Sequence, residues 1–274
     1  MRLAPSEVAR WVPPPARRTA RRALVRYRHL GLRPTDALLV SYPKSGSTWL
    51  RFLLAHALTG QDADFDSIRD TIPPIGRHRR GPALLPGGGR IVRSHEPLRP
   101  YLGRAGQPLI YLVRDGRDVA LSYLEHERRY LRTDGDDGAF VDRFLAGEID
   151  PYGPWHDHVL TALAVGRSGV GPFLQVRYED LRRDPPSQLS RVLTFLNVDR
   201  DPGVLDDVVA ANTKARMRAK EANSAFLGSM ATDGTPFVRP DRKPRWADVV
   251  PEPIRDRCER AWRPALEACG YGVA

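Results

Sequence analysis

The sequence predicts an α/β fold in which a parallel β-sheet is flanked by helices on both faces. Four short apolar runs, rich in Val, Ile and Leu, alternate along the chain with apolar or amphipathic stretches of helical length. This alternation is typical of strand–helix–strand units, whose strands are buried on both sides. Ligands of such sheets bind at the carboxyl ends of the strands, so we expect the loops after the strands to carry the chemistry.

The individual elements follow from the same patterns. The expected strands are 37–42, 90–94, 108–113 and 173–178. The stretch 48–58 is apolar on nearly every side, which predicts a buried helix that stops at Gly60. Asp184 and Pro185 suit the N-cap and the first position of another helix. Further helices are expected at 17–30, 115–131, 138–147, 155–165, 202–212 and 252–268, and polar surface segments at 61–89 and 223–245.

The composition is that of a soluble globular protein. The chain has 274 residues, of which 41% are hydrophobic and 28% are charged, enough for one large domain or two small ones. No stretch approaches the roughly 18 apolar residues of a membrane-spanning helix, and no secretory signal is evident, so a cytoplasmic location is expected. Cys258 and Cys269 are too few for a disulfide scaffold and are expected to be free thiols.

The net charge of +10 is concentrated at the N-terminus. Residues 1–33 hold nine Arg and one Glu, whereas the rest of the chain has a net charge of only +2. We therefore divide the chain into a basic N-terminal arm, 1–33, and a single domain, 34–274. Two interpretations of the arm stay open. It is a solvated arm or a helix lying on the body, or it binds an anionic surface, which would place the protein peripherally at a membrane or on a polyanion.

The loop after the first expected strand has the composition of a phosphate-binding site. It reads Tyr-Pro-Lys-Ser-Gly-Ser-Thr-Trp from 42 to 49 and precedes a helix. Backbone N–H groups at a helix N-terminus attract anions, and Lys44 adds a positive charge. Hydroxyl donors come from Ser45, Ser47 and Thr48. The spacing is not that of a Walker A loop, and an ordinary strand–helix turn is the alternative interpretation.

A histidine follows the second expected strand, in the sequence Arg93-Ser94-His95. A His at a strand end beside a phosphate site can serve as a general base. A lone His is more often an ordinary loop or surface residue, and the other candidates for the role are His56, His126, His156 and His158.

The third loop combines an arginine with a serine. Arg114 closes the third expected strand, and Ser122 lies about two turns into the following helix. This arrangement suits a second phosphate, separate from the first. The alternative is that the Arg and Asp side chains of 114–118 only pair with one another at the surface, where ion pairs contribute little stability.

Together these loops resemble the PAPS-dependent sulfotransferases of the cytosolic type. The segment 42–49 is similar to that family's 5′-phosphosulfate loop, and 114–122 to its 3′-phosphate motif, with Arg and Ser at the matching spacing. Residues 93–95 stand where the family has Lys-Thr-His, whose His is the catalytic base. Two further segments, Gly-Pro-Trp-His-Asp-His-Val at 153–159 and Arg-Tyr-Glu-Asp-Leu at 177–181, also match in the family's order.

The resemblance implies a P-loop-like nucleotide-binding fold that transfers the sulfuryl group of PAPS to a hydroxyl by in-line displacement, with PAP as product and without a metal. It implies that His95 is the general base, that Lys44 stabilises the leaving phosphate and that Arg93 contacts the sulfuryl oxygens. Ser122 would share in the catalytic site. The implied nucleotide contacts are Lys44, Ser45, Gly46, Ser47, Thr48, Trp49, Arg114, Ser122, Tyr178, Arg239, Arg242 and Lys243, with Tyr178 beside the adenine.

The chain departs from the family at two places on the nucleotide side. Where the family has Arg-Lys-Gly-x-x-Gly-x-Trp, residues 239–246 read Arg-Pro-Asp-Arg-Lys-Pro-Arg-Trp, so Arg242 or Lys243 would replace the family's 3′-phosphate contacts. Thr-Lys-Ala-Arg-Met at 213–217 stands where the family often has an aromatic residue stacked on adenine. Lys214 cannot stack as a ring does.

Two other functions remain open from the sequence. The first is a nucleotide kinase or NTPase of related fold, which would need a Walker A loop, an acidic metal-holding strand end and Mg²⁺. The second is a non-catalytic nucleotide-binding module whose arm binds a membrane or a polyanion. The acceptor, a small-molecule, sugar or lipid hydroxyl, is expected to be lined by segments 61–90, 125–152 and 223–245, and no nucleic acid partner is expected.

Overall fold

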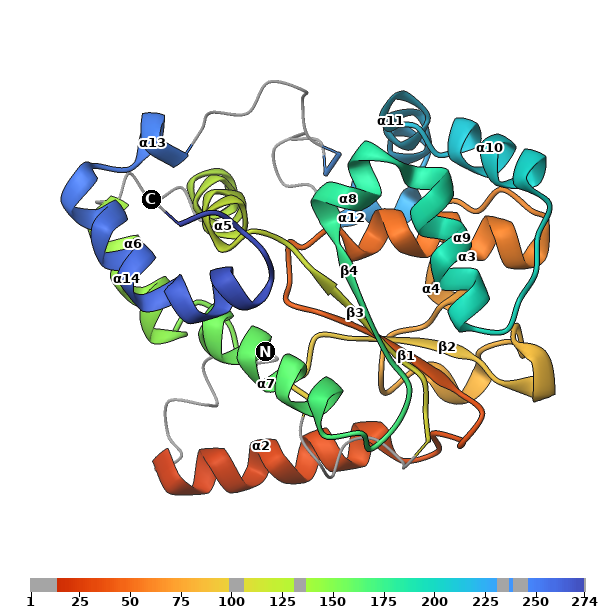
Figure 1. The fold of residues 1–274 in the computed structure, drawn as a ribbon, viewed down its shortest axis with the longest axis horizontal. Coiled ribbons are helices and arrows are strands. Elements are labelled where there is room, and N and C mark those ends of the chain that lie inside the picture. Colours follow the sequence, from red (N-terminus) through yellow and green to blue (C-terminus); the bar gives the residue numbers. More distant parts are fainter. Residues whose placement is uncertain (1–13, 99–105, 131–136, 231–236, 239–245, 274) are drawn as a thin grey trace.

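A computed structural model describes residues 14–98, 106–130, 137–230, 237–238 and 246–273 (Figure 1). Within these ranges four parallel strands form one sheet in the order β2-β1-β3-β4. The strands are β1 (Ala37–Ser41), β2 (Ile91–Ser94), β3 (Leu109–Val113) and β4 (Phe173–Arg177). The predicted parallel sheet is confirmed, and each strand ends within one residue of the bounds expected from the sequence.

Strand β1 lies inside the sheet and is buried on both faces. Leu38 and Val40 pack into the core on one face, and Ala37 and Leu39 pack into the core on the other. Successive side chains of a strand point to opposite sides, so both sets must be apolar. This double burial explains why the run is continuously apolar rather than alternating.

Helices cover both faces of the sheet, as the sequence predicts (Figure 1). One core contains the large rings of Trp155 and Trp262, whose centres are 5.8 Å apart. Its helices are α5 (Gly116–Tyr130), α6 (Asp137–Ala146), α7 (Trp155–Arg167), α13 (Trp246–Val249) and α14 (Glu252–Ala268). The opposite core is built by α3 (Ser47–Thr59), α4 (Ile68–Thr71), α8 (Tyr178–Arg183), α9 (Pro185–Phe195), α10 (Pro202–Ala211), α11 (Lys214–Ala222) and α12 (Ala225–Met230).

Several short helices lie where the sequence predicts other structure. Tyr178, expected at the end of the fourth strand, is instead the first residue of α8, because the chain turns at Arg177 and acidic residues favour a helix N-terminus there. α11 and α12 occupy stretches without a periodic apolar stripe, and Met217 is the buried residue of α11. Asp184 caps α9 as predicted and accepts a hydrogen bond from the Ser187 N–H.

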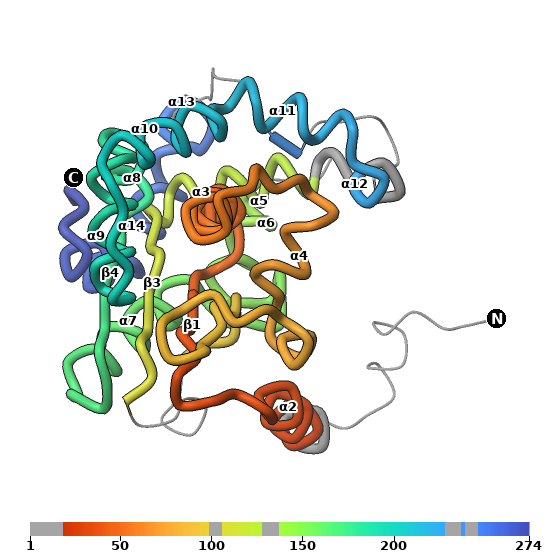
Figure 2. The backbone as a smooth tube through the Cα atoms, turned by 90° about the vertical axis from the view of Figure 1, so that its right-hand side faces the viewer, coloured from red at the N-terminus to blue at the C-terminus, as the bar shows by residue number. Residues whose placement is uncertain are grey.

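The structured part of the basic arm packs against the body of the protein (Figure 2). Helix α2 (Pro14–His29) and the following turn bury Val25 and Leu32. Arg21 and Arg28 form ion pairs with the buried carboxylate of Glu96, at N–O distances of 2.7 and 3.3 Å. Over these residues the arm is therefore a helix lying on the body. None of the helices within the described ranges is long and apolar enough to cross a bilayer.

A buried ion pair joins the starts of β1 and β2 to this turn. The Arg90 Nε donates to Asp36 Oδ1 at 2.9 Å, and its Nη2 pairs with Asp36 Oδ2 at 2.5 Å and also donates to the Gly31 carbonyl. Burial raises the pKa of Asp36, but the hydrogen bonds from Arg90 and Arg33 outweigh burial and hold that pKa below its usual value.

Candidate active site

The loop between β1 and α3 turns around two residues in the left-handed region. Lys44 and Gly46 have φ angles of 66° and 91°. A Cβ on Gly46 would lie 2.4 Å from ring atoms of Tyr178, so the loop can approach this ring only with glycine at that position. Gly46 also supplies no side-chain cap to α3, so the N–H groups of the first turn keep their capacity to bind an anion.

The polar groups of this loop fit a phosphate-bearing ligand. Ser45 is only 1% exposed, and its hydroxyl has no hydrogen-bond partner among the described residues. Ser47 and Thr48 place two more hydroxyls in the first turn of α3. A buried hydroxyl without a partner is unfavourable unless a ligand supplies one, so Ser45 marks the loop as a binding surface.

Arg114 joins this loop to the end of β3. It is buried, donates from Nη1 to the Lys44 carbonyl at 3.0 Å, and pairs through Nη2 with Asp118 at 2.7 Å. Its guanidinium lies 4.9 Å from the centre of the Tyr178 ring, within the range of a cation–π contact. Ser122 is buried further along α5. Because Arg114 is buried and bridges two loops, it is more than a member of a surface ion pair.

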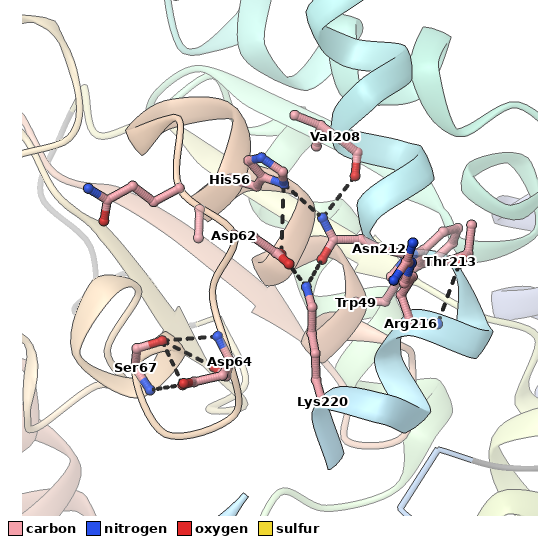
Figure 3. Close-up of polar contacts among 12 residues, drawn as sticks. Trp49, His56, Asp62, Asp64, Ser67, Val208, Asn212, Thr213, Arg216 and Lys220 are labelled. Carbon is pink, nitrogen blue, oxygen red and sulfur yellow. Dashed lines mark hydrogen bonds and ion pairs between the residues drawn. The ribbon is translucent and has the colours of Figure 1, made fainter. Parts of the chain in front are cut away.

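An aromatic pair joins the first turn of α3 to the first turn of α8. The rings of Trp49 and Tyr178 lie 6.4 Å apart at an angle of 77°. The Trp49 indole donates to the Asn212 carbonyl at 2.9 Å, while the Asn212 side chain contacts His56 and Lys220 (Figure 3). These contacts fix the junction of α10 and α11 against α3. They also place His56 in this cluster, where it is used structurally.

His95, directly after β2, is oriented by the main chain. Its Nδ1 lies 2.7 Å from the Ser41 carbonyl oxygen at the end of β1. A carbonyl can only accept, so Nδ1 carries the proton of the neutral ring and Nε2 is the basic nitrogen, which accepts from Arg93 Nη1. Burial, followed by the Arg93 charge, lowers the pKa of His95 well below its ordinary value, so the ring is neutral at neutral pH.

A second buried histidine holds the His95 main chain. His158 Nε2 donates to the His95 carbonyl at 3.1 Å, and its Nδ1 accepts from the Tyr111 hydroxyl at 2.9 Å. Burial lowers the pKa of His158 to about 4, so this ring is also neutral. From the sequence, His158 is only one of several alternative candidates for the general base. Its place in the 153–159 motif was the signal that could have indicated a supporting role.

Glu179 is another residue to which sequence reasoning gave no role. Its carboxylate accepts from the Asp115 N–H at 3.2 Å and from the Tyr271 hydroxyl at 2.8 Å. It therefore ties the loop after β3 to the start of α8, which are the two segments that carry Arg114 and Tyr178.

The predicted site residues fall into two groups around the β1–α3 loop. His95 and Arg93 lie on the β2 side. Toward β3 and β4 lie Trp49, Arg114, Ser122 and Tyr178. This division follows from the strand order, which puts β1 between β2 and β3. Three further predicted nucleotide contacts, Arg239, Arg242 and Lys243, lie outside the described residues.

The fold and this site define an enzyme of the nucleotide-dependent group-transfer class, with a loop suited to a phosphate after β1 and a neutral histidine after β2. The family model for the sulfotransferase domain matches residues 34–270, and the chain therefore belongs to the sulfotransferase family. It is 27% identical over 256 residues to Sulfotransferase 1E1 of Rattus norvegicus, which covers 86% of this chain and 85% of that protein. Sulfotransferase 1 family member D1 of the same species is 28% identical over 230 residues, covering 76% and 75%.

Solved structures confirm the fold. Retinol dehydratase in complex with androsterone and the inactive cofactor PAP superposes with a TM-score of 0.64 at 22% identity, covering 88% of this chain and 83% of that one. Mouse sulfotransferase SULT7A1 complexed with PAP gives a TM-score of 0.64 at 21% identity, covering 88% and 86%. The predicted sulfotransferase fold and family are thereby confirmed, and the kinase and NTPase alternative is not supported.

Proposed function

We propose that the enzyme transfers the sulfuryl group of PAPS to an acceptor hydroxyl, with His95 as the general base. The observation that carries this proposal is the hydrogen bond from His95 Nδ1 to the Ser41 carbonyl, which leaves Nε2 as the basic nitrogen. A general base must be unprotonated at the working pH, and burial and the Arg93 charge keep His95 in that state.

The nucleotide is proposed to lie across the β1–α3 loop. Lys44, the loop hydroxyls and the N–H groups of α3 would hold the 5′-phosphate and stabilise the charge that develops on it as the leaving group. Arg114 and Ser122 would bind the 3′-phosphate, beneath the Tyr178 ring. The unpartnered hydroxyl of Ser45 supports this placement, because a phosphate oxygen can accept a hydrogen bond from it.

The acceptor hydroxyl is proposed to enter beside His95, where the Tyr152 ring lies 5.7 Å from the imidazole. Arg93 donates to His95 Nε2, the atom to which the acceptor hydroxyl would donate. When the hydroxyl takes this position, Arg93 becomes available to contact the sulfuryl oxygens. Retinol dehydratase structures hold androsterone or retinol, which supports a small hydroxyl-bearing acceptor here. A sugar or lipid hydroxyl would use the same base.

Substitution of the base tests the proposal. His95→Ala should lower turnover by about 10²–10⁴-fold, the usual contribution of a general base, while leaving the dissociation constant for PAP nearly unchanged. The matched control is His156→Ala, because His156 is half-buried on α7 and pairs with the exposed carboxylate of Asp157. Turnover and PAP binding by calorimetry would be measured on both variants. A large loss of PAP affinity in His95→Ala would instead assign His95 a structural role.

A further inference from the structure

The outward side of α2 and its following turn carries exposed apolar side chains. Leu24, Tyr27 and Leu30 are 54%, 62% and 55% exposed, and they recur at a spacing of three residues along one side of the helix. Half of the exposed large hydrophobic residues of the described chain are gathered in these seven positions. Arg22 and Arg26 are exposed beside them and pair with no carboxylate among the described residues.

The opposite side of α2 is already occupied. Arg21 and Arg28 are paired with Glu96, Val25 is buried, and Arg21 also donates to the Pro151 carbonyl. The helix therefore cannot rotate to bury its apolar side against the body. The exposed side chains are held outward by the ion pairs on the other face.

A second basic segment, which contains Arg79, lies against the exposed side of α2. Arg79 donates to the Leu30 carbonyl at 3.2 Å, and its guanidinium lies 5.8 Å from the centre of the Tyr27 ring. Neither 8–35 nor 71–95, the two segments that meet here, contains an Asp or Glu. We call Leu24, Tyr27 and Leu30, together with Arg22, Arg26 and Arg79, the α2 outer patch. The patch combines apolar area with positive charge and lacks a carboxylate of its own.

We propose that the α2 outer patch binds the surface of an anionic lipid membrane. Helices that lie in the membrane interface present Leu and aromatic side chains beside Arg or Lys, so that apolar burial and attraction to anionic headgroups act together. A tyrosine suits this depth because its ring is apolar and its hydroxyl is polar. A nucleic acid or another soluble polyanion would use only the charges and leave the apolar side chains in water.

The local charge supports an anionic partner. Residues 14–33, which contain α2, hold seven Arg and no Asp or Glu, whereas residues 34–274 have a net charge of only +2, so the positive charge of the described chain is concentrated on the side where α2 lies. Attraction of this kind acts within about a Debye length and is weakened by salt. We therefore expect the interaction to need both anionic lipid and moderate ionic strength.

Vesicle co-sedimentation of the full chain tests the proposal. Vesicles of equal parts phosphatidylcholine and phosphatidylglycerol should bind the protein, with affinity falling as salt is raised, whereas pure phosphatidylcholine vesicles should not. The triple variant Leu24→Ser/Tyr27→Ser/Leu30→Ser should weaken binding by about tenfold or more at constant charge. Its melting temperature should stay near that of the wild type, because the substituted side chains lie outside the docked face of α2.

A matched control distinguishes the α2 outer patch from exposed apolar side chains elsewhere on the protein. Val170→Ser/Val204→Ser removes two exposed apolar side chains elsewhere on the surface and should leave vesicle binding unchanged. The outcomes that overturn the proposal are equal binding to neutral vesicles, no binding to either kind, and full retention of binding by the triple variant.

The charge of the patch is tested in the same assay. Arg22→Gln/Arg26→Gln should weaken binding to anionic vesicles and reduce its dependence on salt, whereas Arg167→Gln/Arg191→Gln, which removes two exposed arginines from other helices, should not. Binding to a short DNA duplex would be measured in parallel. DNA binding that is as tight as vesicle binding and insensitive to the triple variant would show a polyanion site in place of a membrane site.

Discussion

At the scale of single residues, the orientation of the proposed base, His95, depends on main-chain atoms. The Ser41 carbonyl accepts a hydrogen bond from His95 Nδ1 and so keeps the ring proton on that nitrogen. The His95 carbonyl in turn accepts a hydrogen bond from His158 Nε2. His158 presents an N–H there because the Tyr111 hydroxyl donates to its other ring nitrogen. We therefore expect His158 to position the base and not to act as one.

Two substitutions at His158 separate positioning from packing. In His158→Gln the side-chain amide can reach the site of Nε2 and still donate to the His95 carbonyl. In His158→Asn the shorter amide cannot, so kcat should fall by up to about 10²-fold, as expected when a reacting group is misplaced by about an ångström. PAP affinity, measured by calorimetry, should stay the same in both. Equal loss of kcat in both variants would contradict a positioning role.

The positions of the candidate site residues in the fold could be predicted from sequence because these residues lie at or just after the ends of apolar strands. Lys44, Arg93, His95 and Arg114 are all found at the predicted strand ends. Their supporting partners could not be predicted. Glu179 acts through an N–H and a hydroxyl on segments far away in the chain, so its role depends on tertiary contacts that leave no local pattern.

At the scale of elements, the strands could be predicted from sequence, whereas the contacts that hold some helices in place could not. Burial on both faces makes the strands continuously apolar, which the sequence displays directly. α2 is held mainly by charged side chains on its inner face, so its docking has no apolar signature beyond Val25. The buried pair of Asp36 and Arg90, which connects the first two strands to the turn after α2, is likewise invisible until the fold brings the partners together.

Removing one partner of that pair should be costly. Asp36 accepts hydrogen bonds from both the backbone and the guanidinium of Arg90 and from the Arg33 N–H, so Asp36→Asn should lower the free energy of unfolding by about 3–5 kcal/mol at pH 7. Urea unfolding measures this change. Asp157→Asn, at an exposed carboxylate, should change stability by less than about 0.5 kcal/mol.

The pH dependence of the Asp36 contribution has a definite sign. Its pKa is lower in the folded state than in the unfolded chain, where it is about 3.9. The stabilisation is therefore complete above the unfolded pKa and is lost as the pH falls through the lower folded value. Urea unfolding of the wild type and Asp36→Asn should show a constant difference from pH 7 to 5 and a narrowing one below about pH 4. A difference that grows on acidification would contradict this assignment.

At the scale of the whole molecule, the arm and the catalytic body are one packed unit over the described residues. Arg21 and Arg28 neutralise the buried Glu96, which follows the proposed base. A chain truncated at residue 34 would leave this carboxylate buried without its partners, which is strongly unfavourable. Ligand binding must therefore be measured on the full chain, with the basic arm controlled for by a separate polyanion.

Thermal unfolding of the full chain with different nucleotides tests whether Arg114 binds the 3′-phosphate while the β1–α3 loop binds the 5′-phosphate. PAP at 100 times its dissociation constant should add about 2.7 kcal/mol, which raises the melting temperature by about 5 °C in a protein of this size. The shift with 5′-AMP should be smaller, because the buried guanidinium of Arg114 then has no 3′-phosphate to bind.

Arg114→Ala should remove the difference in melting temperature between the complexes with PAP and with 5′-AMP. Arg117→Ala should preserve it, since Arg117, in the first turn of α5, is partly buried and pairs with Asp115 and Glu259. A short DNA duplex, a polyanion too large for the β1–α3 loop, reports any stabilisation that comes from the arm alone. If Arg114→Ala weakened both nucleotides equally, Arg114 would not bind the 3′-phosphate. If only ATP with Mg²⁺ stabilised the wild type, PAPS would not be the donor.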